Sequence, residues 1–464
     1  MDTHFGNSAA SRDVAHLVKP YTNLKKHKTV GPLIITRGDG IHVIDEGGKS
    51  YIEGMAGLWC ASLGFSEQRL VKAATEAMSR LPFYHQFTHK GHDLAADLGE
   101  RLKALAPVPM SKVFFANSGS EANDTVVKMV WYMNNALGRP KKKKIIARQR
   151  GYHGVTVASA SMTGLPNNHR SFDLPIPGIL HVGCPHWYRE AQPGETPVAF
   201  ADRLAAELEA RIIAEDPDTV AAFIAEPIMG AGGVIMPPET YFPKIQAVLR
   251  KYDVLMVADE VICGFWRTAN FWGSQTFGIE PDILTCAKAL SSAYLPISAV
   301  LVNERVYEAL EAESDRIGVF GHGFTYSGHP VPAAVALETL KIYEERDIGG
   351  HVRRLSPRFA EHVAAFRDRP FVGEARSVGL IGAVELMADP EARRPFPASA
   401  GVPPYLIARA QEHGLILRAI MDVIAFCPPL IIDGAGLDEM FARFDRALAE
   451  TTDWIAANGL DRPA

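Results

Sequence analysis

Five groups of polar residues each follow a short apolar run in the sequence. They are 117–121, 151–154, Glu226 with Pro227, Asp259 with Glu260, and Lys288. Because ligands of open parallel sheets bind beyond the carboxyl ends of the strands, we expect these groups to lie together. They would combine an anion-binding turn, a tyrosine–histidine pair, two acidic positions and one amine. Their shared position at strand ends predicts a single ligand site.

The segment 117–121 reads Asn-Ser-Gly-Ser-Glu and precedes a predicted helix. Gly119 permits backbone conformations that other residues avoid, and successive N–H groups at a helix start can bind a phosphate. Ser118 and Glu121 also match a capping box, in which two side chains satisfy free backbone groups. Both interpretations stay open, because a cap and a phosphate site can share one helix end.

Lys288 ends the apolar run 283–287 and precedes Ala289 and Leu290. Burial between apolar flanks lowers the pKa of a lysine and makes the neutral amine available. A neutral amine is what imine formation with an aldehyde requires. On the local sequence alone, a lysine whose charged end reaches solvent from a strand end is the simpler interpretation.

Two carboxylates end apolar strands. Asp259 ends the run 254–258, and Glu226 ends the run 223–225. A buried carboxylate needs a cationic partner. A protonated pyridine nitrogen is one candidate, and its protonation would make the ring an electron sink. An Arg or Lys salt bridge, or a helix cap, is the alternative for both residues.

His85, His89 and His92 are spaced i, i+4, i+7 and suggest a competing metal site. On a helix they would share one face, as metal ligands often do. Gly91 interrupts the segment and no cysteine or suitable carboxylate completes a ligand set, so we favour an aromatic–histidine surface and expect no metal. The sequence motifs of serine hydrolases and P-loop enzymes are absent.

These residues would be positioned by strands that alternate with helices. The expected strands are 113–116, 145–147, 220–225, 254–258, 283–287 and 297–302, after two helices at 67–80 and 94–105. Such alternation predicts an α/β fold with a mostly parallel sheet covered on both faces. We expect a large domain over residues 61–330. A smaller α/β domain would combine the N-terminal segment 1–60, which contains a hairpin at 41–52, with residues 331–464.

Composition narrows the class of protein. The chain has 464 residues, 47% of them hydrophobic, and a formal net charge of −5. This argues against nucleic acid or an anionic membrane as the main partner. The five cysteines form no C-x-x-C pair, which favours a reducing compartment. With neither a signal-peptide pattern nor a spanning apolar stretch, a cytoplasmic protein is expected.

Four motifs together resemble the class III aminotransferases, which are fold-type I pyridoxal-phosphate enzymes. They are Asn117-Ser118-Gly119-Ser120-Glu121-Ala122-Asn123, Gly151-Tyr152-His153-Gly154, Ala258-Asp259-Glu260-Val261 and Ala287-Lys288. The likeness runs from about Pro20 to Leu430 and is greatest to the ω-amino acid or amine:pyruvate transaminases. It implies the fold of aspartate aminotransferase, with a seven-stranded type of sheet, and pyridoxal 5'-phosphate as cofactor.

The resemblance also implies roles for individual residues. Lys288 would hold the cofactor as a Schiff base and later move a proton. Asp259 would pair with the pyridine nitrogen, and Tyr152 and Val261 would pack on the two ring faces. The other expected cofactor contacts are Ser118, Gly119, Ser120, His153, Glu226 and Thr325. Thr325 would reach the phosphate of a partner subunit, so a homodimer is implied, and a tetramer stays open.

For the substrate, the resemblance implies an aromatic cage above the cofactor. The expected substrate contacts are Tyr21, Trp59, Phe87, Tyr152, Ala231 and Arg418. Arg418 would clamp a substrate carboxylate through two hydrogen bonds and swing away for an apolar amine. The implied reaction moves an amino group from a primary amine or ω-amino acid to a keto acid such as pyruvate, in a ping-pong mechanism. An aminomutase or decarboxylase on the same scaffold is the alternative.

The chain departs from the family pattern at five positions where glycine is common. They are Trp266, Ala269, Ala289, Ala293 and Met421. Because glycine often marks a positive φ or a close approach, these residues affect backbone geometry and pocket volume. They lead to the hypothesis of a reshaped or engineered substrate pocket.

Overall fold

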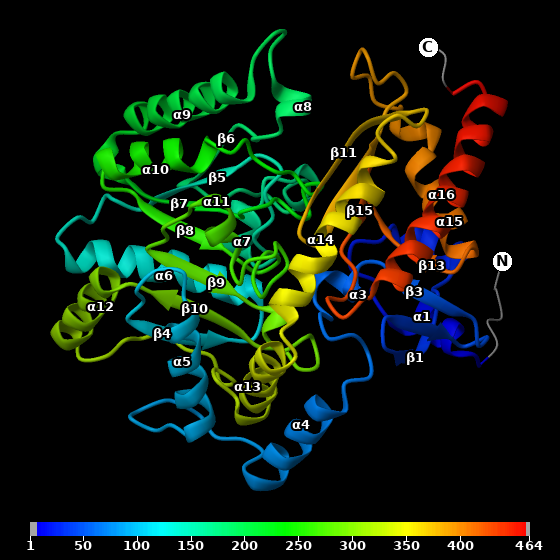
Figure 1. Cartoon of the computed structure of the whole chain (residues 1–464). Coiled ribbons are helices and arrows are strands. Elements are labelled where there is room, and N and C mark those ends of the chain that lie inside the picture. Colours follow the sequence, from blue (N-terminus) through cyan, green and yellow to red (C-terminus); the bar gives the residue numbers. More distant parts are fainter. Residues whose placement is uncertain (1–6, 461–464) are drawn as a thin grey trace.

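The predicted strands form a seven-stranded sheet in the order β4-β10-β9-β8-β7-β5-β6 (Figure 1). This computed structural model describes residues 7–460. The strands are β4 (Lys112–Ala116), β5 (Lys144–Arg148), β6 (Ile179–Val182), β7 (Val220–Ala225), β8 (Leu255–Asp259), β9 (Ile283–Cys286) and β10 (Ser298–Val302). Only β10 runs antiparallel to its neighbours β4 and β9, and β5 to β9 pair in parallel. The mostly parallel α/β sheet is confirmed.

Side chains of this sheet alternate between two cores. On β7, Ile224 packs toward α6 (Gly119–Ala136) and α12 (Glu304–Ile317). Its neighbour Phe223 packs toward α9 (Pro197–Ala214) and α10 (Tyr241–Lys251) on the opposite face. Figure 1 shows these helix pairs on the two sides of the sheet. Burial of all six residues of β7 explains why its sequence is a continuous apolar run.

Two four-stranded sheets lie beside this unit. One has the order β1-β2-β3-β13 and the other β11-β12-β15-β14. Their strands are β1 (Ile35–Asp39), β2 (His42–Asp45), β3 (Ser50–Glu53), β11 (Val372–Val378), β12 (Ile381–Leu386), β13 (Leu415–Ile416), β14 (Arg418–Ile420) and β15 (Val423–Phe426). Because β13 pairs in parallel with β3, segments from both ends of the chain share a sheet.

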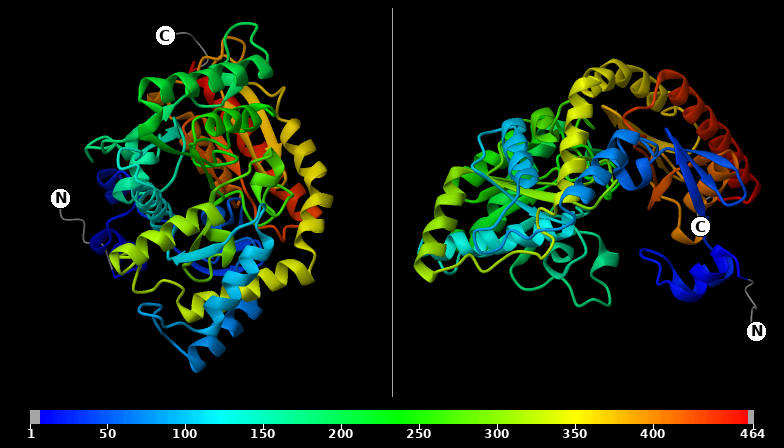
Figure 2. Two further views of the ribbon diagram at one scale, coloured as in Figure 1. Left: turned by 90° about the vertical axis from the view of Figure 1, so that its left-hand side faces the viewer. Right: turned by 90° about the horizontal axis from the view of Figure 1, so that it is seen from below.

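We call the part built on the seven-stranded sheet the large lobe, and the part built on the two smaller sheets the small lobe. The helix α14 (Ile348–Ala364) follows α13 (Pro330–Glu345) and runs as a curved arch between the lobes (Figure 2). Helices α15 (Val402–Glu412) and α16 (Gly434–Ala457) complete the small lobe. The domain boundaries at residues 60 and 330 remain predictions.

The remaining helices are mostly short. They are α1 (Ala9–His16), α2 (Leu24–Val30), α3 (Ala56–Trp59), α4 (Gln68–Arg80), α5 (Asp93–Leu105), α7 (Val157–Met162), α8 (Trp187–Glu190) and α11 (Gly273–Phe277). The predicted helices 67–80 and 94–105 correspond to α4 and α5. Between residues 7 and 460, no helix is long and apolar enough to cross a membrane.

Candidate active site

One cavity of about 380 Å³ brings the five predicted groups together. Its lining includes Ser118, Gly119, Ser120, Tyr152, His153, Gly154, Glu226, Asp259, Val261 and Lys288. Glu121, Gly151 and Pro227 do not line it, and neither does Glu260. Its carboxylate accepts the backbone N–H groups of Gly273 and Ser274 at the start of α11, away from the cavity.

The start of α6 forms the anion-binding end of the cavity. The Ser118 hydroxyl accepts the N–H of Glu121 at 3.1 Å, and the Glu121 carboxylate accepts the N–H of Asn117 at 2.7 Å. These contacts cap the helix, as the sequence suggested. The first N–H groups of a helix have no partner within it, and here those of Gly119 and Ser120 line the cavity. The cap and the anion site therefore coexist.

Gly119 permits a close approach between α6 and the strand end at Asp259. A Cβ atom at Gly119 would lie 3.2 Å from a methyl carbon of Val261. At Gly154, which has a φ of 134°, a Cβ atom would lie 2.6 Å from the Ser120 hydroxyl oxygen. Both glycines therefore keep side chains out of the region where an anion would bind.

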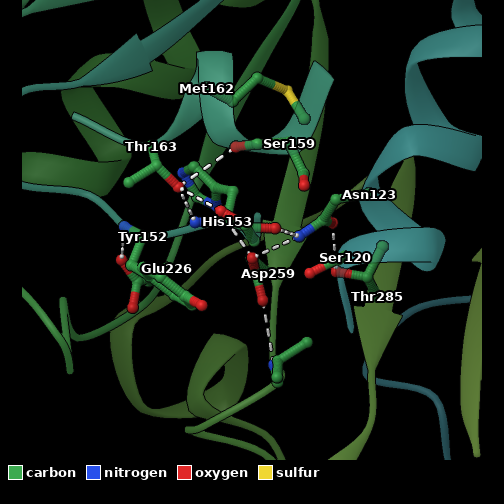
Figure 3. A network of polar contacts seen from close by, with 12 residues as sticks. Ser120, Asn123, Tyr152, His153, Ser159, Met162, Thr163, Glu226, Asp259 and Thr285 are labelled. Carbon is green, nitrogen blue, oxygen red and sulfur yellow. Dashed lines mark hydrogen bonds and ion pairs between the residues drawn. The ribbon is translucent and has the colours of Figure 1, made fainter. Parts of the chain in front are cut away.

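Asp259 is held at the end of β8 by three hydrogen bonds (Figure 3). Its Oδ2 atom accepts from Nδ1 of His153 and from Nδ2 of Asn123, both at 2.8 Å. Its Oδ1 atom accepts the N–H of Val261 at 3.1 Å. Among the described residues, no Arg or Lys forms an ion pair with this buried carboxylate. A ring cation bound in the cavity would supply the missing positive charge.

Asn123 was not among the predicted site residues, although it belongs to the motif 117–123. Its amide oxygen accepts from Thr285 at 3.0 Å, so the amide bridges β8 and β9. The signal that could have found it is its spacing: Asn123 lies three residues after Ser120, on the same side of α6. Cys60 also lines the cavity without having been predicted.

Glu226 supports the backbone of the segment that carries Tyr152. One carboxylate oxygen accepts the N–H of Tyr152 at 2.9 Å, and the other accepts the N–H of Gly230 at 3.0 Å. Burial raises the pKa of this carboxyl group above its ordinary value. Glu226 therefore fixes the backbone of Tyr152 through this N–H group.

Lys288 follows β9 in a left-handed backbone conformation, with a φ of 49°. Such strain in a residue other than glycine is concentrated at functional sites. Burial lowers the pKa of the Lys288 amine, while Asp259 acts in the opposite direction. The neutral, nucleophilic form of the amine is thereby favoured.

Tyr152 connects the cavity to the expected substrate residues. Burial raises the pKa of its hydroxyl group, and Tyr21 raises it further. The positive charge of Arg418 lowers the same pKa. Tyr21 and Arg418 therefore lie within electrostatic range of Tyr152, and Tyr21 also accepts a hydrogen bond from the Asn168 amide at 2.7 Å.

Apart from Tyr152, all the expected substrate contacts, including Tyr21 and Arg418, lie outside the cavity lining of this chain, and so does the expected cofactor contact Thr325. Trp59 is only 3% exposed and packs beside Met55 and Ile420, next to the cavity residue Cys60. Ala231 is buried in the segment after β7. Phe87 and Thr325 are exposed, and Phe87 lines a second hollow beside residues 318–323.

Four of the five positions where the family commonly has glycine do have positive φ values. They are Trp266, Ala269, Ala293 and Met421. Only Ala293 lines the cavity. Trp266 packs against Phe271 and under the Arg353 guanidinium, and Met421 is 56% exposed. A reshaped pocket through Trp266 or Met421 therefore remains a hypothesis.

The histidine alternative fails because residues 82–91 are irregular and do not form a helix. His92 caps α5 and its Nε2 atom lies 2.7 Å from the Gly328 carbonyl. His85 stacks on exposed Tyr84 and does not gather with the other two histidines. Among residues 7–460, the one cluster of potential metal ligands is His186, Glu374 and Glu385.

The cavity fits pyridoxal phosphate. Free N–H groups at the start of α6 match its phosphate, and the unpaired charge of Asp259 matches a protonated ring nitrogen. Lys288 offers an amine with a lowered pKa to its aldehyde, and Tyr152 and Val261 line the space between.

Known proteins of similar sequence and structure identify the family of this chain. The class-III aminotransferase family matches residues 23–448. A γ-aminobutyrate transaminase of Solanum lycopersicum, named as mitochondrial, is 51% identical over 94% of this chain and 85% of its own length. One from Oryza sativa subsp. japonica is 50% identical over 95% of this chain and 86% of its own.

Among solved structures, the omega transaminase of Pseudomonas jessenii in complex with PMP is 58% identical. It covers 97% of this chain and 99% of its own, with a TM-score of 0.96. A metal-binding function, an aminomutase and a decarboxylase are not favoured by these relatives. This chain therefore belongs to the class-III aminotransferases and is a transaminase that depends on pyridoxal phosphate.

Proposed function

We propose that this transaminase moves an amino group from a primary amine or ω-amino acid to a keto acid such as pyruvate. The observation that carries this proposal is that Arg418 begins β14, a strand whose Ile420 packs in one cluster with Trp59, the neighbour of the cavity residue Cys60. A guanidinium can bind a carboxylate through two parallel hydrogen bonds. A substrate carboxylate bound there would lie beside the cavity that Lys288 lines.

Bound pyridoxal phosphate supplies an aldehyde and a ring that accepts electrons when its nitrogen is protonated. Asp259 would hold that proton on the nitrogen, with its own position fixed by His153 and Asn123. Lys288 would take a proton from the substrate carbon that carries the amino group. It would return the proton to C4′, the aldehyde carbon of the cofactor. Tyr152, fixed by Glu226, would keep the ring plane oriented.

Relatives support both substrate classes without deciding between them. The plant proteins are named for γ-aminobutyrate, an ω-amino acid. A variant of the Pseudomonas jessenii enzyme, engineered for the synthesis of bulky amines, is changed at one tryptophan, one phenylalanine and one arginine. Trp59, Phe87 and Arg418 are residues of the same three types, which supports their assignment to the substrate site.

Arg418→Ala is expected to raise the KM for pyruvate and for γ-aminobutyrate about 10- to 100-fold. Hydrogen bonds to a charged group contribute about 1.5–3 kcal/mol, and about 1.4 kcal/mol is a factor of ten. The KM for isopropylamine, which has no carboxyl group, should change little. Steady-state kinetics with alanine as the measured product checks this.

Arg358→Ala is the matched control, because Arg358 is an exposed small-lobe arginine that pairs with Asp438. It should leave all three KM values unchanged. Equal KM values for pyruvate in Arg418→Ala and the parent enzyme would refute the assigned role. Failure to form alanine and acetone in equal amounts from isopropylamine and pyruvate would refute the reaction itself.

The proposal includes a homodimer with an active site at the interface. Phe87 and Thr325 are exposed and lie outside the cofactor cavity of their own chain. They belong to a region that also exposes Phe83, Tyr84 and Tyr326. Large exposed aromatic residues are typical of protein interfaces. Such a region could complete the site of a second copy.

Thr325→Val is expected to lower cofactor affinity by about tenfold, the effect of one lost hydrogen bond to a charged phosphate. Sedimentation velocity should show a dimer or a pair of dimers. A monomer that binds cofactor with unchanged affinity in the Thr325→Val variant would contradict the shared site. Ser314→Ala, on the neighbouring helix α12, is a suitable control.

A cytoplasmic location is part of the same proposal. All five cysteines are free, as expected in a reducing compartment. The plant relatives, in contrast, are named for mitochondria or chloroplasts.

A further inference from the structure

A network of charged side chains joins the two lobes away from the cofactor. It contains three guanidinium groups, three carboxylates and one histidine. The large lobe contributes Arg150, His186 and Arg189, and the small lobe contributes Glu374, Arg376, Glu385 and Asp422. The opposite charges are equal in number, so burial of the network leaves no net charge from its arginines and carboxylates.

Arg376 is the centre of this network. Its guanidinium donates to the carbonyl oxygens of Gly233 at 2.5 Å and Val234 at 2.8 Å, in the large lobe. It also donates to Glu385 at 2.6 Å, on the neighbouring strand β12. Against the effect of burial, Arg376, His186 and Arg189 lower the pKa of Glu385 to about 2. Glu385 therefore stays ionised. Its carboxylate binds Arg189 of the large lobe and Arg376 of the small lobe.

The cluster of His186, Glu374 and Glu385 has the ligand types of a metal site. Its carboxylates are already occupied, because Arg376 donates to both. Nε2 of His186 lies 2.9 Å from Glu374, and Nδ1 lies 3.5 Å from the Arg150 guanidinium. Burial lowers the pKa of His186, while its contact with Glu374 acts in the opposite direction. The guanidinium of Arg376 is therefore the cation that Glu374 and Glu385 bind.

Arg189 extends the network to the strand that carries Arg418. It donates to Glu385 and, at 3.2 Å, to Oδ2 of Asp422. Asp422 and Met421 form the two-residue turn between β14 and β15. Asp422 also accepts the N–H of Leu386 through its carbonyl oxygen at 2.8 Å. The turn is thus fixed to the small sheet by its backbone and to the large lobe by its side chain.

β14 needs this second attachment because it is an edge strand. It pairs with β15 on one side, and Arg418 is its first residue. An edge strand has unpaired backbone groups on its other side and is held by fewer contacts than a central strand.

At the opposite end of the network, Arg150 lies two residues before Tyr152. The network therefore connects the backbone near Tyr152 with the hairpin of Arg418.

We propose that the Arg189–Asp422 ion pair positions the β14–β15 hairpin so that Arg418 meets a substrate carboxylate above the cofactor. The inference rests on the proposed function of Arg418. Arg189 and Asp422 are positioning residues, since they would act on the substrate only through the hairpin that carries Arg418. Loss of the pair would free the hairpin and weaken binding of carboxylates, while the chemistry at Lys288 would be preserved.

The test uses Asp422→Asn in the holoenzyme, because asparagine keeps the shape of the side chain and the backbone hydrogen bond to Leu386. We expect the KM for pyruvate to rise about fivefold, as for the loss of a partly buried ion pair. The KM for isopropylamine and kcat should change less than about twofold. Hydrogen exchange of residues 418–426 should become faster. Asp422→Glu should restore part of the pyruvate affinity.

Two further variants separate positioning from general stability. Asp445→Asn removes an ion pair with Arg369 that lies wholly in the small lobe, and it should change no KM. Arg189→Gln, which also removes the contact of Arg189 with Glu385, should raise the pyruvate KM at least as much as Asp422→Asn. The double variant should resemble Arg189→Gln because the coupling is already lost.

The outcomes separate the inference from the function on which it rests. An unchanged pyruvate KM in Asp422→Asn, or an equal rise for pyruvate and isopropylamine, would overturn the positioning role even when Arg418→Ala impairs pyruvate binding. An unchanged pyruvate KM in Arg418→Ala would overturn the proposed function and this inference together.

Discussion

Lys288→Ala is expected to lower kcat/KM for the reaction of isopropylamine with pyruvate by about 10⁴-fold, the upper range for loss of a positioned acid–base group. Two tasks depend on this amine: covalent attachment of the cofactor and movement of the substrate proton. The pKa of Lys288 is lowered by burial, so the amine is suited to both. Alanine formation, followed at saturating cofactor, measures the effect.

Lys142→Ala provides the matched control for this experiment. Lys142 is also buried and its pKa is also lowered by burial. Its ammonium donates to the carbonyl oxygens of Pro217 and Tyr252, which makes it a structural residue. The control should lose thermal stability and keep its kcat. A Lys288→Ala enzyme with near-normal turnover would contradict the account.

Asp259→Asn is expected to lower kcat for both half-reactions by about 10²–10³-fold, the usual cost of removing a preorganised electrostatic contact. The neutral amide could not stabilise a positive charge on the ring nitrogen. His153 and Asn123 would also lose the carboxylate that both now contact. Single-turnover kinetics with an amine alone and with a keto acid alone measure the two halves separately.

Glu260→Gln is the control for the neighbouring position. Glu260 is buried, its pKa is raised to about 7 by burial, and its carboxylate accepts N–H groups at the start of α11. Its loss should lower stability and leave both half-reactions at their normal rates. Equal losses of activity in Asp259→Asn and Glu260→Gln would show that a general loss of structure, and no ring contact, explains the first result.

The sequence was sufficient to place most of the large sheet, because its strands are continuous apolar runs between polar turns. β6 was not predicted: it has four residues and includes His181, so it lacks the apolar signal. The antiparallel direction of β10 could not be predicted either. An apolar run has the same composition in both directions, and direction is set by the path of the chain between strands.

The site was predictable where it depends on strand ends. Parallel strands end at one edge of the sheet, so Asp259, Glu226 and Lys288 had to meet there. The pattern of strand ends offered both Asp259 and Glu260, whose side chains point to opposite faces of the strand, and the family resemblance selected Asp259. The cavity face of β8 could be identified only once its packing was known.

The network between the lobes was invisible to pattern analysis. Arg376 and Glu385 are buried in strands, where charged residues are rare unless paired. His186 and Arg189, the partners of Glu385, and Asp422, the second partner of Arg189, come from distant parts of the chain. Likewise, the helical spacing of His85, His89 and His92 was misleading, because Pro82 and Gly91 flank a segment that forms no helix.

The central claim is that Lys288 binds the cofactor covalently. Borohydride reduction of the holoenzyme, followed by proteolysis and mass spectrometry, tests it most directly. We predict a single pyridoxyl group on the peptide that contains Lys288. A pyridoxyl group on any other lysine, with Lys288 unmodified, would contradict the account.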